Sequence, residues 1–452
     1  MHDPLLLPEL REMLNENDAP AMREFCTIFH PGVVAENLAA LTPAEAWHVL
    51  SQSNLRQQVE IFEFMELDRQ IELVSTIDKP RLSALIEEMS ADDRAELLRN
   101  MDEDQVELLL PLIAQAERSD IRKLLSYPES SAGALMTTEY ASLREELTVR
   151  EALAALHSQA PNRETIYYVY VLDEARHLHG FVSLRKLILA RPDALVRDIM
   201  ETDVLSVNVN DDQEAVANKM ARYDFIAIPV VDAEERLVGI ITHDDVLDVM
   251  REEATEDAHR MGAVAPLEDG YLSTPFFTLA WKRGIWLILL LVAGFGTSSL
   301  LNLYDGVTEQ HEWLVWFLPL VLASGGNSGS QSATLIIRSM SLGEMSRANQ
   351  PRIIRREFAT GLVLGSAMGL MAFVFASQYV QWPHALVVAS TIALVVTFGT
   401  TNGTLLPIAL RHLGCDPALM SNPLIASLSD ALGVLIYYNV ALLCLRLMSP
   451  AA

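Results

Sequence analysis

Five long stretches with almost no charge, all in the C-terminal part of the chain, restrict its fold more than any other feature. The first, Gly284–Leu301, is eighteen residues without a charge. Four more follow it: Trp313–Ile337, Phe358–Trp382, Ala385–Leu410 and Pro417–Leu445. Because each can cross roughly 30 Å of hydrocarbon as a helix, the sequence predicts an α-helical membrane domain of five spanning helices over residues 273–452.

The basic residues between these stretches predict which side of the membrane each connection faces. Lys282 and Arg283 precede the first helix, five arginines lie in the second connection and Arg411 in the fourth, whereas the first and third connections hold none. The positive-inside rule therefore places the N-terminus in the cytoplasm and, after five helices, the C-terminus outside. Arg446, near the C-terminus, is the one basic residue that does not fit this orientation. The first thirty residues lack the pattern of a cleaved signal peptide, so we expect a multi-pass protein of the cell (inner) membrane.

The region before the membrane block is strongly acidic. Residues 1–270 carry 53 of the 60 Asp and Glu residues but 24 of the 33 Lys and Arg residues, a net charge of −29. Such an excess repels nucleic acid and favours divalent cations as partners, while the apolar block requires a lipid bilayer. The three cysteines lie far apart without CxxC spacing and predict no zinc, redox or disulfide framework.

Asp430 is the one carboxylate inside the last apolar stretch. Hydrocarbon tolerates an ionisable group poorly, at a cost of roughly 2.5–3.5 kcal/mol on insertion scales, so such a residue usually faces a bundle interior or an aqueous path. We interpret Asp430 as an acid of a cation pathway. The alternative is a structural acid at a helix end or paired with an arginine.

The second apolar stretch contains Pro319 and the small, polar run Ala323–Gln331 (ASGGNSGSQ). Glycine and proline can break a helix at membrane depth and free carbonyl groups for a hydrated ion. Close helix packing is the competing interpretation, but Asn327 and Gln331 favour a pore-lining run. The third stretch differs, because its glycines have no polar companions and therefore predict packing; they are Gly361, Gly365 and Gly369.

Residues 133–252 contain a degenerate internal repeat of two α/β copies. The strand Ile166–Leu172 in the first copy corresponds to Ala227–Val231 in the second, and Gly180–Ser183 corresponds to Gly239–Thr242. Two similar units of this kind are expected to pack as a pseudo-symmetric pair. The order of elements resembles a tandem of CBS domains, which are regulatory ligand-binding modules, over residues 133–196 and 197–252.

Residues 1–132 lack strand patterns and repeat short phrases typical of capped helix starts. These phrases are Leu41–Glu45, Leu67–Ile71, Met89–Asp93 and Met101–Gln105. They predict an all-α, solenoid-like N domain with its acids pointing outward. Residues 253–272 are expected to form an acidic connecting helix on which Glu253, Glu256 and Asp257 share one face. That face is either a solvated connector or a surface that binds divalent cations against other acids.

Together, the acidic helical domain, the CBS pair, the connecting helix and the five spanning helices resemble the MgtE family of magnesium channels. Pro319 with Gly325–Gln331 and the segment Asn422–Asp430 carry the resemblance most specifically. The family is homodimeric, which implies that two copies of Asp430 meet on one path and hold a largely hydrated Mg²⁺. The implied pore residues are Asp430, Asn422, Ala426, Asn327 and Gln331.

The resemblance also implies a gate that cytosolic Mg²⁺ closes by bridging carboxylates of the N domain, the CBS pair and the connecting (plug) helix. Two like charges 4 Å apart repel by about 4 kcal/mol at an effective dielectric near 20, so a few bridges suffice to switch populations. Mg²⁺ is thus expected as both the transported and the regulatory ion. The regulatory acids that match by position are Asp92, Glu96, Asp212, Glu214, Asp224, Asp245, Asp248, Glu253, Glu256 and Asp257.

Some CBS pairs bind adenine nucleotides through an aspartate three residues after a Gly-x-x-Ser/Thr element. The second copy has Asp245 at that position, but the first has Lys186. A ribose-binding carboxylate is therefore missing, which puts ATP binding in doubt, although a lysine can meet phosphate.

No HExxH, GxSxG or GxxxxGK[ST] motif occurs, so we expect neither an enzyme nor a nucleotide-driven pump. Passive import of Mg²⁺ through a channel is the favoured function. The alternatives are a coupled secondary divalent cation transporter or exporter, and a non-conducting metal sensor for which the membrane part is an anchor.

Overall fold

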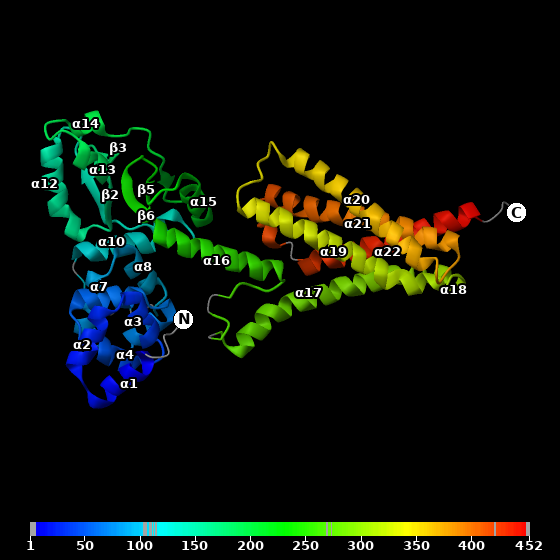
Figure 1. Ribbon diagram of the computed structural model, residues 1–452, viewed down its shortest axis with the longest axis horizontal. Coiled ribbons are helices and arrows are strands. Elements are labelled where there is room, and N and C mark those ends of the chain that lie inside the picture. The colour runs from blue at the N-terminus through cyan, green and yellow to red at the C-terminus, as the bar shows by residue number, and fades with distance from the viewer. Residues whose placement is uncertain are drawn as a thin grey trace. The chain divides into compact units, whose positions relative to one another are not determined.

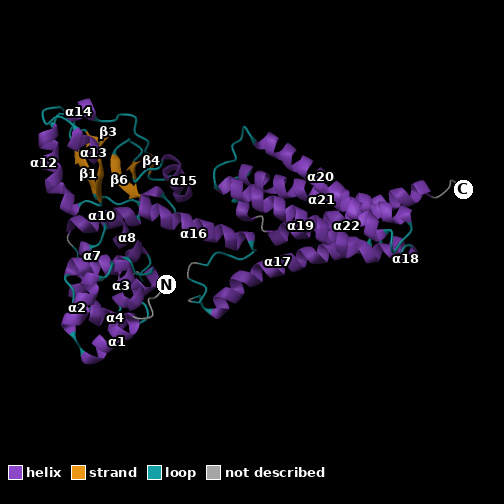
Figure 2. Cartoon of the chain, viewed as in Figure 1, coloured by secondary structure: helices purple, strands orange, loops and turns teal. Residues whose placement is uncertain are grey.

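The computed structural model describes residues 6–102, 106–107, 111, 113, 115–267, 270–272, 274–419 and 422–448. The chain forms two compact units, Met1–Met250 and Arg251–Ala452. Figure 1 traces the chain through both, and Figure 2 shows that the described strands belong to the first unit, whereas the second is helical.

Short helices make up the first part of the first unit. They are α1 (Leu6–Glu16), α2 (Ala19–Ile28), α3 (Pro31–Leu38), α4 (Pro43–Leu50), α5 (Leu55–Glu63), α6 (Leu67–Val74), α7 (Lys79–Glu88), α8 (Ala91–Arg99) and α10 (Gln115–Leu125). From α2 to α8 each helix packs against the second one along the chain, such as α3 on α5 and α5 on α7. This alternation is what a solenoid-like array requires.

The local sequence explains where several of these helices begin. Thr42 and Glu45 form a capping box before α4, in which Glu45 Oε2 accepts a hydrogen bond from Thr42 N at 2.9 Å. Helices α6 and α8 also begin within the predicted phrases. The fourth phrase, Met101–Gln105, lies partly outside the described residues.

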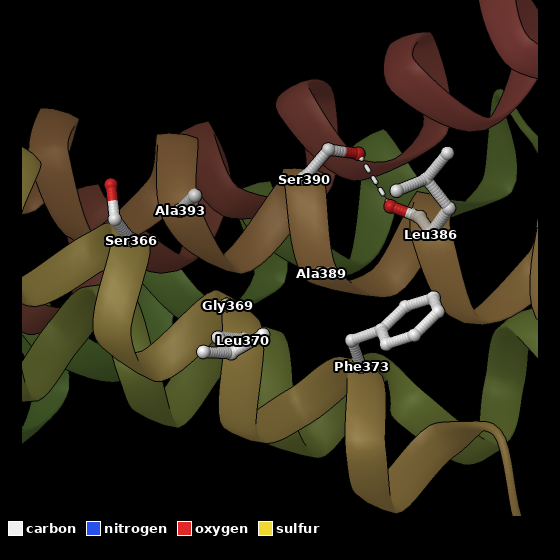
Figure 3. A pocket seen from close by; sticks show the side chains of 8 residues that line it. All are labelled: Ser366, Gly369, Leu370, Phe373, Leu386, Ala389, Ser390 and Ala393. Carbon is white, nitrogen blue, oxygen red and sulfur yellow. Dashed lines mark hydrogen bonds between the residues drawn. The ribbon is translucent and has the colours of Figure 1, made fainter.

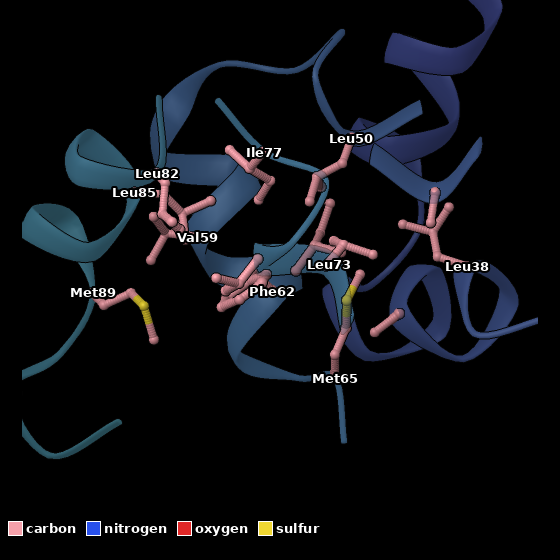
Figure 4. Close-up of a cluster of buried hydrophobic side chains, with 14 of the residues drawn as sticks. Leu38, Leu50, Val59, Phe62, Met65, Leu73, Ile77, Leu82, Leu85 and Met89 are labelled. Carbon is pink, nitrogen blue, oxygen red and sulfur yellow. The ribbon is translucent and has the colours of Figure 1, made fainter. Parts of the chain in front are cut away.

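Apolar side chains from these helices form one continuous core. Figure 4 shows part of it, with Phe62 and Leu73 at the centre and Leu85 and Met89 toward the later helices. Phe62, Leu73 and Leu85 are fully buried. Burying a side chain of this size contributes roughly 1.5–3 kcal/mol, which fixes the helical array as one body despite the short length of each helix.

Two three-stranded sheets follow, one in each copy of the repeat. The first copy contains α11 (Ala132–Leu135), β1 (Tyr140–Leu143), α12 (Val149–Gln159), β2 (Thr165–Leu172), β3 (Leu178–Ser183) and α13 (Leu184–Leu189). The second contains α14 (Val196–Ile199), β4 (Val207–Asn208), α15 (Gln213–Tyr223), β5 (Ala227–Val231), β6 (Leu237–Thr242) and α16 (His243–Met261). In both sheets the middle strand pairs in parallel with the first strand and antiparallel with the third.

The two copies meet at corresponding turns. The main-chain nitrogen of Leu237 donates to Arg176 O at 2.9 Å, and that of Leu178 donates to Glu235 O at 3.4 Å. Because equivalent turns exchange equivalent bonds, the copies form the pseudo-symmetric pair that the repeat predicted.

The second unit is built from long helices. They are α17 (Phe276–Asn302), α19 (Trp313–Ser341), α20 (Gln350–Ala376), α21 (Trp382–His412) and α22 (Asn422–Met448), with a short α18 (Asp305–Gln310). Among the described residues, α17, α20, α21 and α22 are long and apolar enough to cross a membrane. The helix α19 is as long, but its run of serines, glycines, Asn327 and Gln331 leaves it without a stretch as apolar as those of the other four.

Several predicted bounds differ from the structure for local reasons. The third apolar stretch does not run to Trp382, because α20 ends at Ala376 and Trp382 with Pro383 begins α21. The last one starts late, since Pro417–Leu419 is a separate 3₁₀ turn. The connecting helix is the end of α16 and stops at Met261, where Ala263 adopts a left-handed φ of 56°, rather than at residue 272.

Candidate functional site

The small residues of α19 bring three helices into close contact. A Cβ atom on Gly399 of α21 would lie 2.6 Å from Gly325 O, and one on Gly326 would lie 3.3 Å from Ala426 Cβ of α22. The helix α19 continues unbroken through Pro319 and Ala323–Gln331. The helix break that glycine and proline can cause is therefore not present in α19, and these glycines serve the close packing that was the competing interpretation.

The same packing places Asp430 against α19. Its Oδ1 atom lies 3.7 Å from the position of a Cβ on Gly326, and the residue is half-buried. Asn422, Ala426 and Asp430 follow each other at intervals of four and so share one face of α22. That face adjoins α19, which packs along α22.

Asn327 and Gln331 also share a face, and both are exposed in the single chain. Two amide side chains on a helix at membrane depth need polar partners, because hydrocarbon offers none. The structure therefore leaves a polar surface on α19 uncovered beside the half-buried Asp430.

Two hydroxyl groups that sequence analysis missed hold Asn422 in place. Ser330 Oγ donates to Asn422 O at 3.1 Å, and Thr334 Oγ1 donates to Asn422 Oδ1 at 3.2 Å. Ser330 and Thr334 are four residues apart, so the spacing that singled out Asn327 and Gln331 also contained this signal.

A second carboxylate, Glu357, also lies within an apolar helix and was missed. Ser332 Oγ donates to Glu357 Oε2 at 2.7 Å and lies 2.9 Å from Thr404 Oγ1, so three helices, α19, α20 and α21, share this polar contact. Ser332 and Thr404 are buried. Glu357 directly follows Arg355 and Arg356 in the sequence, so the sequence pattern placed it in the polar connection before the helix.

In the first unit, carboxylates from the helical array and both CBS copies face one another; we call them the acidic cluster. Its members are Glu63, Asp92, Asp93, Glu139, Glu164, Asp244, Asp245 and Asp248. The structure thus brings the predicted acids Asp92, Asp245 and Asp248 together. It adds Asp93 and Asp244, which adjoin predicted acids in sequence, and Glu63, Glu139 and Glu164, which lie too far away in sequence for any spacing rule to connect.

Burial and mutual repulsion raise the pKa values in this cluster. Burial, followed by the charge of Asp93, raises the pKa of Glu63 to about 8. Burial, followed by the charge of Asp244, raises the pKa of Glu164 to about 7. Burial also raises the pKa of Asp245 to about 7, against a hydrogen bond from Thr242 Oγ1 at 2.7 Å. Burial and Asp245 hold the pKa of Asp92 well above its usual value. Ionising all the carboxylates of the cluster therefore costs free energy in the folded state.

The Oδ1 atom of Asp92 is buried and accepts no hydrogen bond from the described residues. Such an orphaned carboxylate oxygen, with further acids around it, fits the oxygen ligands that Mg²⁺ prefers, with water completing its shell. Within the described part of the chain, no three Asp, Glu, His or Cys residues already have the spacing of a metal site. An ion would thus have to draw the carboxylates closer or bind through water.

The remaining predicted regulatory acids are not members of this cluster. Asp212 caps α15, accepting from Glu214 N at 3.0 Å, and Asp224 ends that helix with a φ of 54°. Glu96 is exposed on α8. In the second unit, Glu253, Glu256 and Asp257 lie on the end of α16: Glu256 forms an ion pair with Arg260, and Ser341 donates a hydrogen bond to Asp257, whose pKa burial nevertheless raises.

Lys186 follows Ser183, whose Oγ accepts a hydrogen bond from Lys186 N at 3.2 Å as the cap of α13. The Lys186 ammonium lies 3.4 Å from Glu201 Oε1. The first CBS copy thus presents an ion pair at this position, whereas the second presents the carboxylate of Asp245 to Thr242.

Comparisons with known proteins agree with this architecture. Three family models match: "MgtE intracellular N domain" over residues 29–130, "CBS domain" over 132–193 and 196–252, and "Divalent cation transporter" over 318–440. The magnesium transporter MgtE of Thermus thermophilus is 40% identical over 98% of this chain and 99% of its own. That of Bacillus subtilis is 38% identical over 83% of this chain and 84% of its own.

Two solved structures resemble about half of this chain. The soluble part of a magnesium transporter is 35% identical, has a TM-score of 0.52, and covers 55% of this chain and 98% of its own. The cytosolic domain of the Mg²⁺ channel MgtE in complex with ATP is 41% identical, also has a TM-score of 0.52, and covers 54% of this chain and 99% of its own.

A CBS pair joined to a helical block with an intramembrane carboxylate beside a polar helix face defines a membrane transporter for divalent cations. With relatives this similar along nearly their full length, the chain belongs to the MgtE family of magnesium transporters. Magnesium transport is accordingly its class of function.

Proposed function

We propose that this protein is a channel through which Mg²⁺ enters the cytoplasm down the membrane potential. The half-buried Asp430 beside the exposed Asn327 and Gln331 carries this proposal, because a carboxylate with neighbouring amides can hold a hydrated Mg²⁺ without stripping its water. Asn422 and Ala426 continue the same face of α22 and complete the proposed pore lining.

The pathway requires a second copy of the chain. On one copy the face with Asn327 and Gln331 is open, and a symmetric homodimer closes it by placing the same face opposite. We therefore propose that α19 is the fifth spanning helix, with the N-terminus in the cytoplasm and the C-terminus outside. Its low apolarity then follows from lining a hydrated path.

Cytosolic Mg²⁺ closes this channel by neutralising carboxylates of the first unit and of α16. Elevated pKa values in the acidic cluster support the idea, because buried carboxylates that repel one another are more favourably charged when a cation lies between them. Asp92, Asp245 and Asp248 are the proposed ligands within the cluster. The proposed regulatory ligands outside the cluster are Glu96, Asp212, Glu214, Asp224, Glu253, Glu256 and Asp257.

Glu357 supports one alternative, a coupled secondary divalent cation transporter or exporter. A second intramembrane carboxylate is what proton coupling requires, and Glu357 accepts a hydrogen bond from the buried Ser332. A channel takes up Mg²⁺ at a rate set by the electrochemical gradient of Mg²⁺, whereas a coupled transporter also responds to an imposed pH gradient, and Glu357→Gln removes that response.

The decisive experiment measures Mg²⁺ uptake into liposomes containing the full-length protein and its Asp430→Asn variant. We expect uptake to fall at least tenfold, which corresponds to about 1.4 kcal/mol. Asp305→Asn is the matched control, because Asp305 is an exposed carboxylate in the short α18. Equal uptake by both variants would show that Asp430 is not on the pathway.

Binding of ATP to the first CBS copy remains a separate prediction. The relative solved with ATP shows that a cytosolic domain of this family accepts the nucleotide. Here Lys186 pairs with Glu201, so we expect weak ATP binding that the Lys186→Asp substitution strengthens. Isothermal titration of both proteins with ATP measures this, and unchanged affinity would remove Lys186 from the argument.

A further inference from the structure

A groove of about 400 Å³ runs between α20 and α21, away from every residue of the proposed pathway. Figure 3 shows it from close by, with side chains of both helices along it. The residues that matter for its shape are Ser366, Leu370, Phe373, Leu386, Ala389 and Ala393. The volume falls in the range of sites that hold small ligands.

Glycine makes the floor of this groove. A Cβ atom on Gly369 would lie 2.7 Å from Ala389 O, so the two helices touch through their backbones there. Larger side chains rise on both sides: Leu370 is 67% and Leu386 50% exposed. Because the helices touch at their backbones and larger apolar side chains stand on both sides, an open apolar groove is left between them.

The lining offers water few hydrogen-bonding groups. Ser366 Oγ donates to Leu362 O at 2.7 Å, and Ser390 Oγ donates to Leu386 O at 2.8 Å, so both hydroxyl groups are used within their own helices. The other lining atoms are apolar, and apolar spaces of this kind stay dry and take hydrocarbon.

The groove also has the depth of one membrane leaflet. Tyr379 and Trp382, at the loop that joins the two helices, are exposed, as aromatic residues at a membrane interface are. From Trp382 to Ala393 the helix rises about 16 Å at 1.5 Å per residue, which is about half of a 30 Å hydrocarbon layer. A chain that starts at the aromatic level therefore reaches the end of the groove near the membrane centre.

A second copy of the protein is not the occupant. The surface that needs a protein partner is the polar face of α19 beside α22, whereas α20 makes its main contact with α21 alone. We propose that the groove holds one acyl chain of a phospholipid, bound tightly enough to stay with the protein, with its head group at the level of Tyr379 and Trp382.

Lipid retention tests this proposal on the full-length protein. The wild type and two filling variants, Ser390→Phe and Ala393→Leu, are loaded with dioleoyl phosphatidylethanolamine in detergent, washed extensively, and analysed by native mass spectrometry. We expect the wild type to retain about one more phospholipid per chain than either variant. Val363→Phe is the matched control, because Val363 is exposed on α20 outside the groove, and it should behave like the wild type.

Equal retention by all four proteins, or no retention by the wild type, would overturn the proposal. Thermal unfolding provides a second measurement, in which the Tm of each protein with added lipid is compared with the Tm of the same protein without it. Added dioleoyl phosphatidylethanolamine should raise the Tm of the wild type and of Val363→Phe more than that of the filling variants. Equal shifts would mean that the lipid acts on the surface in general.

Discussion

Thr334 Oγ1 donates a hydrogen bond to Asn422 Oδ1 at 3.2 Å, which joins the polar face of α19 to the first residue of α22. Ser330 reinforces this joint by donating to Asn422 O. Asp430 lies two turns further along α22, so the orientation of that helix at Asn422 determines where the carboxylate lies.

We expect Thr334→Val to lower Mg²⁺ uptake roughly fivefold, because loss of one hydrogen bond of about 1 kcal/mol frees the Asn422 amide and loosens the start of α22. Thr401→Val is the control, since Thr401 Oγ1 donates to Thr397 O within its own helix. Liposome uptake measures both. If the two variants transport equally well, the Thr334–Asn422 bond does not position the pathway.

The acidic cluster predicts a stability that falls as the pH rises. The carboxyl groups of Glu63 and Asp245 have pKa values of about 8 and about 7 when folded and near 4 when unfolded. Between these limits the folded state binds more protons, so stability is greatest at the acidic end and is lost as the pH passes 7 to 8. Without divalent cations, we expect the Tm of residues 1–250 to be roughly 5 °C lower at about pH 8.5 than at about pH 6.

Circular dichroism melts at constant ionic strength measure this difference, and related cytosolic parts have been solved as separate proteins. Millimolar Mg²⁺ should restore the Tm more at the higher pH, because only charged carboxylates gain from a cation. A Tm that is independent of pH would remove the strain argument for the gate.

Asp92 is the residue on which this strain should depend most, because its Oδ1 is buried without a partner. We expect Asp92→Asn to raise the stability of the first unit at about pH 8 without cations by roughly 1 kcal/mol, and to reduce the gain from Mg²⁺. Glu88→Gln, an exposed carboxylate on α7, is the control and should leave both quantities unchanged. A lower stability for Asp92→Asn would mean that the carboxylate has a favourable role in the folded state.

Local signals predicted most of the fold. The bounds of β5 agree with the predicted strand, because an apolar run between Asp224 and Asp232 leaves little freedom. The predicted start of the last spanning helix at Pro417 was wrong. Proline is also common at a helix start, and hydropathy does not register the 3₁₀ turn before α22. Element types thus followed from sequence more reliably than their ends.

The candidate site was predictable only where its residues share one helix. Asp430 was predicted because it is a carboxylate within an apolar stretch, and Ala426 and Asn422 were implied by the family resemblance on the same helix, whereas the contact of Glu357 with Ser332 depends on how α20 packs on α19. The same holds for the acidic cluster, in which Glu63, Glu164 and Asp245 come from distant parts of the chain. Tertiary packing decides such contacts, and no single-sequence pattern encodes them.

An ion pair between Arg260 and Asp416 ties the end of α16 to the segment before α22. Asp416 also accepts through Oδ1 from Ala418 N at 2.8 Å, which stabilises the 3₁₀ turn. The substitution Asp416→Asn keeps that acceptor and removes the charge, so it isolates the ion pair. Because both side chains are about one-third exposed, the pair contributes about 1 kcal/mol.

We therefore expect Asp416→Asn to speed amide hydrogen exchange in residues 251–261 up to fivefold in the full-length protein. Arg260→Gln also removes the ion pair with Glu256, so it should speed exchange at least as much, and the double variant should add little to Arg260→Gln because the pair with Asp416 is already lost. Arg347→Gln, an exposed arginine in the connection after α19, should leave exchange unchanged. Additive effects of Arg260→Gln and Asp416→Asn would show that the two residues act independently, and α16 would then be held by other contacts.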